Sequence, residues 1–113
     1  MPDQTTTYTD QTAFDAMCDH LMAQGCRAAA PSGSCRYRIT KPYGRVLKCA
    51  VGALIPDAAY RPNFEGRNAL HVVLHVPELA DVSTDLLTQV QNIHDDLAPS
   101  AWPEALKSVA STY

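Results

Sequence analysis

Apolar residues recur at two different spacings along this chain, and the change of spacing divides it into predicted elements. Between residues 12 and 24, apolar positions three and four apart predict an amphipathic helix that starts after Thr9 or Thr12 and stops at Gly25. Thr12 and Asp15 resemble a capping box at its start. Residues 35–51 alternate apolar and polar positions around the turn sequence KPYG, which predicts an antiparallel hairpin.

The second half of the chain is predicted to be mainly helical. Residues 50–60, AVGALIPDAAY, favour a short helical turn, and RPNFEGRN reads as a loop. The segment ALHVVLHVPEL fits either a strand or a short helix ended by Pro77, and we favour the helix. Ser83 or Thr84 and then Ser100 are expected to cap two further helices. Their apolar stripes comprise Leu86, Leu87, Val90, Ile93 and Leu97, followed by Trp102, Leu106, Val109 and Tyr113.

These elements predict the α+β fold class in one small domain. An N-terminal helix precedes a two-stranded antiparallel hairpin, and a C-terminal helical hairpin covers the apolar face of the strands. The length of 113 residues suits a single core, with residues 1–9 as a flexible N-terminus and 10–113 as the domain. Two strands alone are marginally stable, so a third strand from residues 70–76 or from a second subunit is conceivable. Both a monomer and a homodimer therefore remain open.

Composition restricts where such a chain is expected to work. The first residues lack the basic flank and apolar run of a signal peptide, and no apolar run is long enough to cross a membrane. We therefore expect a cytoplasmic protein with no membrane partner and no cofactor. In a reducing cytosol its cysteines are expected to be free thiols. Their spacing lacks the short Cys-x2–4-Cys chelate, so no metal site is predicted; they are Cys18, Cys26, Cys35 and Cys49.

Charge is unevenly distributed along the chain. The net charge is −3, but no carboxylate lies between Asp19 and Asp57, an interval that carries +6, while the rest carries −9. Basic side chains on the solvent face of the hairpin could bind an acidic protein surface or the phosphates of a nucleic acid, with a tyrosine near the tip for stacking. Alternatively, they pair with carboxylates inside the fold. The predicted binding residues are Arg36, Arg38, Lys41, Tyr43, Arg45 and Lys48.

Two constellations suggest chemistry, although we assign no catalytic residue from them. Cys49 lies at the end of the second predicted strand, where a helical turn begins, so a small Cys-dependent enzyme that uses Cys49 with His94 and Asp95 is an alternative hypothesis. Strand alternation instead points this thiol into the core. His71 and His75 would align on a helix for one metal ion, but the Glu of an HExxH motif is absent.

An ordered set of short motifs resembles a group of small uncharacterised proteins encoded in phages, prophages and bacterial genomes. The set is CRYR, KCAVGALIPD, Tyr60, the EG pair at residues 65 and 66, LTQVQNIHD and Trp102, and it spans roughly residues 12–112. The chain departs from the pattern at Ala53, where the group often has cysteine, and in the His-containing segment 70–76. The group has no established activity, so the resemblance implies a setting, a phage or mobile-element accessory protein, and no site residue.

These observations together favour a non-enzymatic protein that binds a host macromolecule through a basic β-hairpin. A host protein with an acidic surface is the leading partner, and nucleic acid is the alternative. Interference with a host defence or regulatory complex would suit the phage setting. The net negative charge argues against tight non-specific binding to DNA, which usually requires a broadly basic domain.

Overall fold

The computed structural model describes residues 7–29, 35–42 and 44–110 and has four helices and a two-stranded antiparallel hairpin in this part of the chain. The helices are α1 (Asp10–Gln24), α2 (Ala69–His75), α3 (Thr84–Asp96) and α4 (Trp102–Ala110), and the strands are β1 (Arg38–Thr40) and β2 (Val46–Lys48). This is the predicted α+β class. The segment with two possible readings, residues 70–76, is helical apart from Val76.

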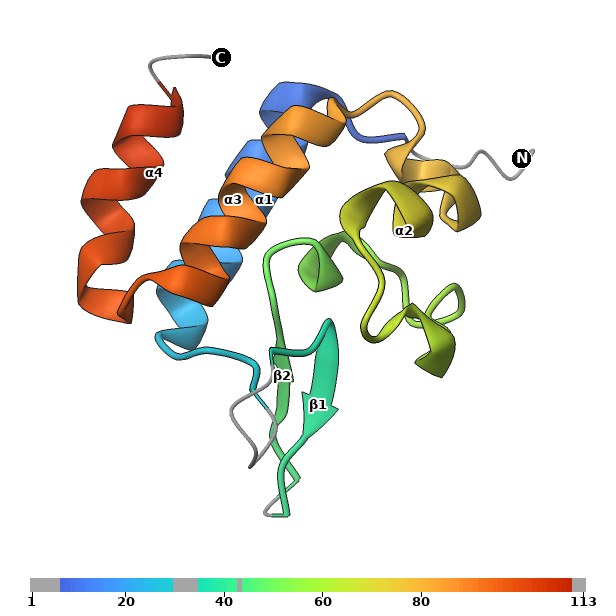
Figure 1. Cartoon of the computed structure of the whole chain (residues 1–113), viewed down its shortest axis with the longest axis horizontal. Coiled ribbons are helices and arrows are strands. Elements are labelled where there is room, and N and C mark those ends of the chain that lie inside the picture. The colour runs from blue at the N-terminus through green and yellow to red at the C-terminus, as the bar shows by residue number, and fades with distance from the viewer. Residues whose placement is uncertain (1–6, 30–34, 43, 111–113) are drawn as a thin grey trace, which may run out of the picture.

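Helix α3 organises the helical part of the molecule, because it packs against α1, α2 and α4 (Figure 1). Four members of the predicted apolar stripe are buried on α3, namely Leu86, Leu87, Val90 and Ile93, whereas Leu97 lies just past the helix end and is half-buried. The short turn predicted after Cys49 is a single 3-10 turn, Gly52–Leu54, that packs on α1. The main core comprises Met17, Leu21, Tyr37, Cys49, Val51, Leu54, Phe64, Val72, Leu86, Leu87, Val90, Trp102 and their neighbours.

The hairpin projects away from this helical body, as Figure 1 shows. Its two strands pair in the register Arg38 with Lys48, Ile39 with Leu47 and Thr40 with Val46. The predicted turn is present, because the Gly44 N–H donates to Lys41 O at 2.8 Å. Only the base of the hairpin, through Tyr37 and Cys49, joins the main core. The strands therefore hold the distal turn outside the packed body.

Three boundaries differ from the sequence predictions. The capping box of α1 lies one turn earlier than expected, with Thr9 as N-cap and Thr12 as its reciprocal partner, because Thr9 satisfies the free N–H groups of a helix that begins at Asp10. Ser100 does not cap α4; it lies inside a 3-10 turn, Pro99–Ala101, that leads into that helix. The strands are three residues each, so Cys49 follows β2.

Two predicted features fall partly outside the described residues. Residues 1–6 of the predicted flexible N-terminus are outside, whereas Tyr8 packs against the core and donates its N–H to Glu78 O at 2.9 Å. Tyr43 and Tyr113 also lie outside the described residues. Within the described part of the chain, no helix is both long and apolar enough to cross a membrane.

Candidate functional site

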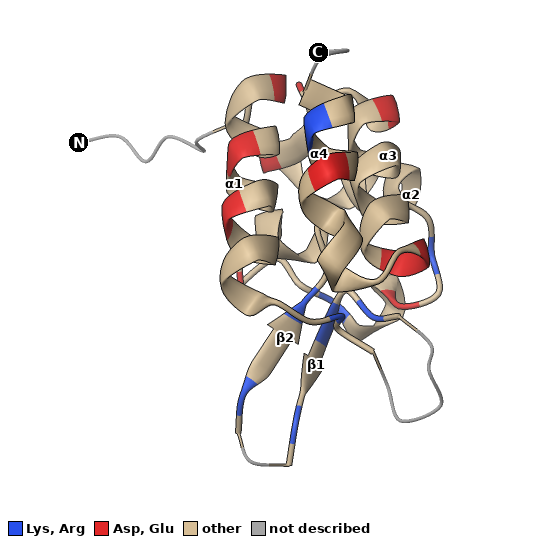
Figure 2. Cartoon of the chain, turned by 90° about the vertical axis from the view of Figure 1, so that its left-hand side faces the viewer, with Lys and Arg blue, Asp and Glu red and all other residues tan. Residues whose placement is uncertain are grey.

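The basic side chains of the hairpin lie apart from the acidic side chains of the helices. Figure 2 shows Lys and Arg along the hairpin and at its base, with Asp and Glu mainly over the helices. Among the described residues, the hairpin cations form ion pairs only with Asp57, a loop residue, and none with a helix carboxylate. The charge asymmetry of the sequence therefore becomes an asymmetry in space.

Arg38 and Lys48 lie directly opposite each other in the ladder, an arrangement of like charges that costs stability unless it is compensated. Asp57 supplies the compensation, with its Oδ1 2.7 Å from Arg38 Nη2 and 3.7 Å from Lys48 Nζ. The Arg38 guanidinium also lies over the ring of Tyr60, 4.6 Å from the ring centroid. Arg38 and Lys48, two of the predicted binding residues, thus already interact with other residues of the fold.

The other hairpin cations are held by backbone carbonyls or point outward. Lys41 Nζ donates to Ala29 O, and Arg45 Nη2 donates to Gln24 O, each at 3.0 Å. Arg36 is exposed. Because a carbonyl neutralises no charge, Arg36, Lys41 and Arg45 keep a full positive charge available to a partner.

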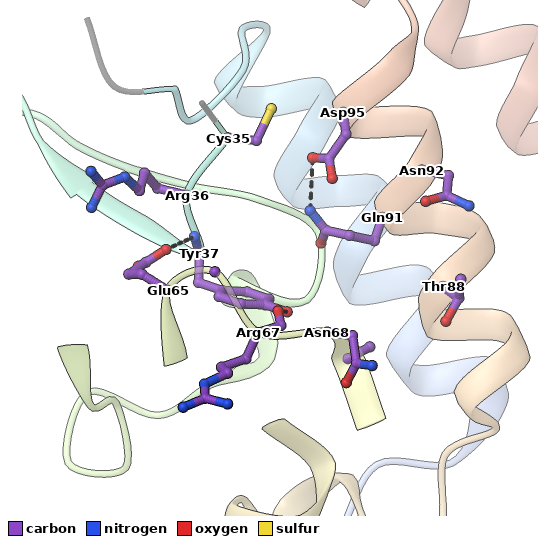
Figure 3. A pocket seen from close by; sticks show the side chains of 12 residues that line it. Cys35, Arg36, Tyr37, Glu65, Arg67, Asn68, Thr88, Gln91, Asn92 and Asp95 are labelled. Carbon is purple, nitrogen blue, oxygen red and sulfur yellow. Dashed lines mark hydrogen bonds between the residues drawn. The ribbon is translucent and has the colours of Figure 1, made fainter. Parts of the chain in front are cut away.

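A polar cavity of about 280 Å³ lies where the base of the hairpin meets α3. Figure 3 shows Thr88 and Asn92 projecting from α3 on one side of it, with Tyr37 and Arg67 opposite. Glu65 holds the hairpin side of this cavity in place, since its carboxylate accepts hydrogen bonds from the N–H groups of Tyr37 and Arg38 at 2.9 and 3.2 Å. It accepts a third from the Tyr60 hydroxyl at 2.6 Å. Glu65 therefore joins the hairpin to the loop after Asp57.

His94 is completely buried and has both ring nitrogens occupied. Nε2 accepts the Ala28 N–H at 3.0 Å, so this nitrogen carries no proton, and Nδ1–H donates to Asp95 Oδ1 at 2.7 Å. The Trp102 ring stacks on the imidazole with centroids 5.7 Å apart. Because Nε2 is blocked by a backbone amide, His94 has no free nitrogen with which to accept a proton from a substrate or thiol.

The Asp95 carboxylate, at the end of α3, accepts hydrogen bonds from three side chains. Burial alone would raise its pKa, but hydrogen bonds from His94, Cys35 and Gln91 lower the pKa of Asp95 instead. The dipole mismatch of an anion at a helix C-terminus is offset further by Arg27. Its Nε donates to His94 O at 3.1 Å and its Nη2 to Leu97 O at 2.6 Å.

Cys35, His94 and Asp95 have ligand atoms within 4.8 Å of one another, a grouping that could suggest a metal ion. The hydrogen bonds argue against it. A metal on Nδ1 of His94 would leave the ring without any proton while the Ala28 N–H still occupies Nε2. Burial and then Asp95 raise the pKa of Cys35 to about 11, which disfavours the thiolate that a metal requires. The trio is better explained as a buried polar network.

Cys49 lies beside this network but is shielded from solvent. It is 1% exposed, burial is the main cause that raises the pKa of its thiol, and its Sγ accepts the Gly52 N–H at 3.3 Å. Since His94 cannot act as its base, the arrangement of Cys49, His94 and Asp95 gives no nucleophilic pair. The Cys-dependent enzyme thus has no support from the geometry.

Alkylation of the native protein at pH 8 should be slow at three of its four cysteines. Burial, and then the carboxylates near each thiol, raise the pKa of Cys18 and of Cys35 from an ordinary 9 to about 11, which lowers the thiolate fraction by about 100-fold. Cys26 should be labelled first and Cys49 only on unfolding, as measured by peptide mass mapping over time. Asp95→Asn should accelerate Cys35 specifically. Rapid labelling of native Cys49 would restore the enzyme hypothesis.

Sequence reasoning missed the residues that tie the site together. Glu65, Gln91 and Arg27 make their decisive contacts with residues 28 or more positions away in the chain, for example Gln91 Oε1 with the Val51 N–H at 3.0 Å. Gln91 is typical of the polar side of an amphipathic helix, and nothing local distinguishes it. The one usable clue was the pair of carboxylates at the end of α3, which required a compensating cation.

Comparison with known protein families, curated proteins and solved structures found no match for this chain.

Proposed function

We propose that this protein is a non-enzymatic accessory protein that binds an acidic surface of a host macromolecule through its basic hairpin. The projection of that hairpin from the helical body, with cations on it and carboxylates mainly on the helices, is the observation that carries the proposal. A projecting basic element opposite an acidic body orients the molecule toward a negatively charged partner and speeds the encounter.

The contact residues divide into two groups by what they do in the fold. Arg36, Lys41 and Arg45 make no ion pair with any described residue and form the proposed contact surface, together with Tyr43 of the turn sequence. Arg38 and Lys48 share Asp57 and mainly stabilise the base of the hairpin. We therefore expect binding to depend on the first group, and folding to depend on the second.

A protein partner suits these charges better than a nucleic acid does. The described cations are concentrated at one end of the molecule, and the helical body carries most of the carboxylates. A long polyanion that extended past the hairpin would meet those carboxylates, whereas an acidic patch on a protein is met by the hairpin alone. The resemblance to phage and prophage proteins adds a setting, interference with a bacterial defence or regulatory complex.

Charge reversal at Arg36→Glu with Arg45→Glu should abolish capture of the partner from a nuclease-treated bacterial lysate. Both side chains are exposed, so the folded structure should tolerate the change. Quantitative mass spectrometry of captured proteins, with wild type alongside, measures the effect.

The matched control reverses the same number of charges elsewhere, at Arg61→Glu and Lys107→Glu, both exposed and off the hairpin. It should capture the same protein as wild type. Equal capture by the hairpin variant would refute the proposed surface. A partner that disappears on nuclease treatment would show that the hairpin binds nucleic acid.

A further inference from the structure

Helix α2 brings two histidines together outside the site described above. His71 and His75 are one helical turn apart, and their ring centroids are 4.7 Å from each other with a tilt of 52°. The sequence spacing alone required a helix for this alignment, and the structure provides it. Asn68 caps the helix by accepting the His71 N–H at 3.0 Å, which fixes the start of the turn that carries the pair.

Phe64 fixes the two rings from behind. Its ring lies 6.2 Å from that of His71, edge to face, and 6.3 Å from that of His75, stacked. The same three rings line a cavity of about 460 Å³ together with Ala59, Arg61 and Asn63. The imidazoles are thus pre-oriented beside an open space, unlike His94, whose nitrogens are both occupied.

We propose that His71 and His75 form half of a binding site for a zinc-class divalent ion and that a second copy of the chain supplies the other half. Zinc bonds imidazole nitrogen at about 2.0–2.1 Å in tetrahedral geometry, so two ligand nitrogens lie about 3.3 Å apart. Rings whose centroids are 4.7 Å apart can place one nitrogen each at that separation by small torsions.

The need for a second copy follows from the ligands that one copy offers. The cavity lining contains two imidazoles and no carboxylate or thiol, which is two ligands short of a tetrahedral set. Arg61 also lines this cavity, and its Nη1 donates to Ala58 O and Tyr60 O at 3.0 Å, so these hydrogen bonds fix its position beside the two rings.

The neighbouring surface of α2 suits contact with the same surface of another copy. Leu70 and Leu74 are 54% and 72% exposed and lie one turn apart, next to the histidine stripe. A twofold axis between two α2 helices would bring these leucines together and place four imidazoles around one ion. The apolar contact and the incomplete ligand set therefore require the same partner.

The test is sedimentation velocity of tag-free protein with and without added Zn²⁺, combined with titration calorimetry. We expect a monomer in EDTA, a dimer in Zn²⁺ and a stoichiometry of one ion per two chains. His71→Gln and His75→Gln should each weaken Zn²⁺ binding by about 10-fold or more and abolish the dimer. Loss of a residue that only hydrogen-bonds a metal ligand typically weakens metal binding by about 10-fold or more, and loss of the ligand itself should cost at least as much. His20→Gln, which removes a histidine on α1, should dimerise as wild type does.

Leu70→Ser with Leu74→Ser provides a second, independent test. It should weaken dimerisation while the Co²⁺-loaded dimer that remains at high protein concentration keeps the intense visible absorption of a tetrahedral site. Zn²⁺ binding at one ion per monomer, a dimer that forms equally in EDTA, or unchanged binding in the histidine variants would each overturn the proposal. The hairpin variants leave α2 intact, so failure of the proposed function would not affect this result.

Discussion

Replacement of His94 by alanine is expected to lower the free energy of unfolding by about 4 kcal/mol. The imidazole is fully buried, and its removal leaves the Ala28 N–H and one side of Asp95 without their partners. It also leaves a cavity beneath the Trp102 ring that stacks on it. Each of these effects is unfavourable, and together they account for the size of the expected loss.

Urea denaturation followed by fluorescence measures this loss directly, because Trp102 is the single tryptophan of the chain and contacts the altered side chain. His94→Gln serves as a folding-competent companion variant, since its amide oxygen can still accept from Ala28 and should recover part of the loss. His20→Ala is the matched control. That ring is half-buried with one hydrogen bond, to Lys48 O at 2.8 Å, and should cost about 1 kcal/mol. Equal losses at both positions would contradict the network.

The elements of the fold were predictable where their determinants are local. The stripe Leu86, Leu87, Val90 and Ile93 specifies α3 because a buried helix face repeats every three to four residues whatever it packs against. Boundaries were less certain, because neighbouring residues compete for the same role. Thr9 and Thr12 are both good caps, and the free N–H groups of the first turn decided between them.

The site was less predictable, because its contacts join distant parts of the chain. The charge run of the hairpin was visible in the sequence, but the division between Arg38, which Asp57 neutralises, and Arg36, which stays exposed, depends on a loop 19 residues further on. His94 and Asp95 were noted as a pair, yet their role is set by Ala28, 66 positions away from His94. A periodic pattern carries no information about such partners.

The second large effect is expected at Gly52, where alanine should lower the free energy of unfolding by about 2–3 kcal/mol. The backbone conformation of Gly52 is open to any residue, so the cost is steric. A Cβ at this position would overlap the carbonyl oxygen of Tyr37, which itself accepts the Cys49 N–H at 3.3 Å. The 3-10 turn and the hairpin base would have to separate to make room.

Gly44→Ala separates this steric effect from a general intolerance of glycine replacement. Gly44 lies in the hairpin turn with φ of +92° and has nothing within 4 Å of an added Cβ, so its substitution should cost about 1 kcal/mol through backbone strain alone. The two variants should also differ at Cys49. If Gly52→Ala opens the junction, native Cys49 becomes reactive to iodoacetamide, whereas in Gly44→Ala it stays protected. Protection of Cys49 in both variants would mean that the turn and the hairpin are not locked together at Tyr37.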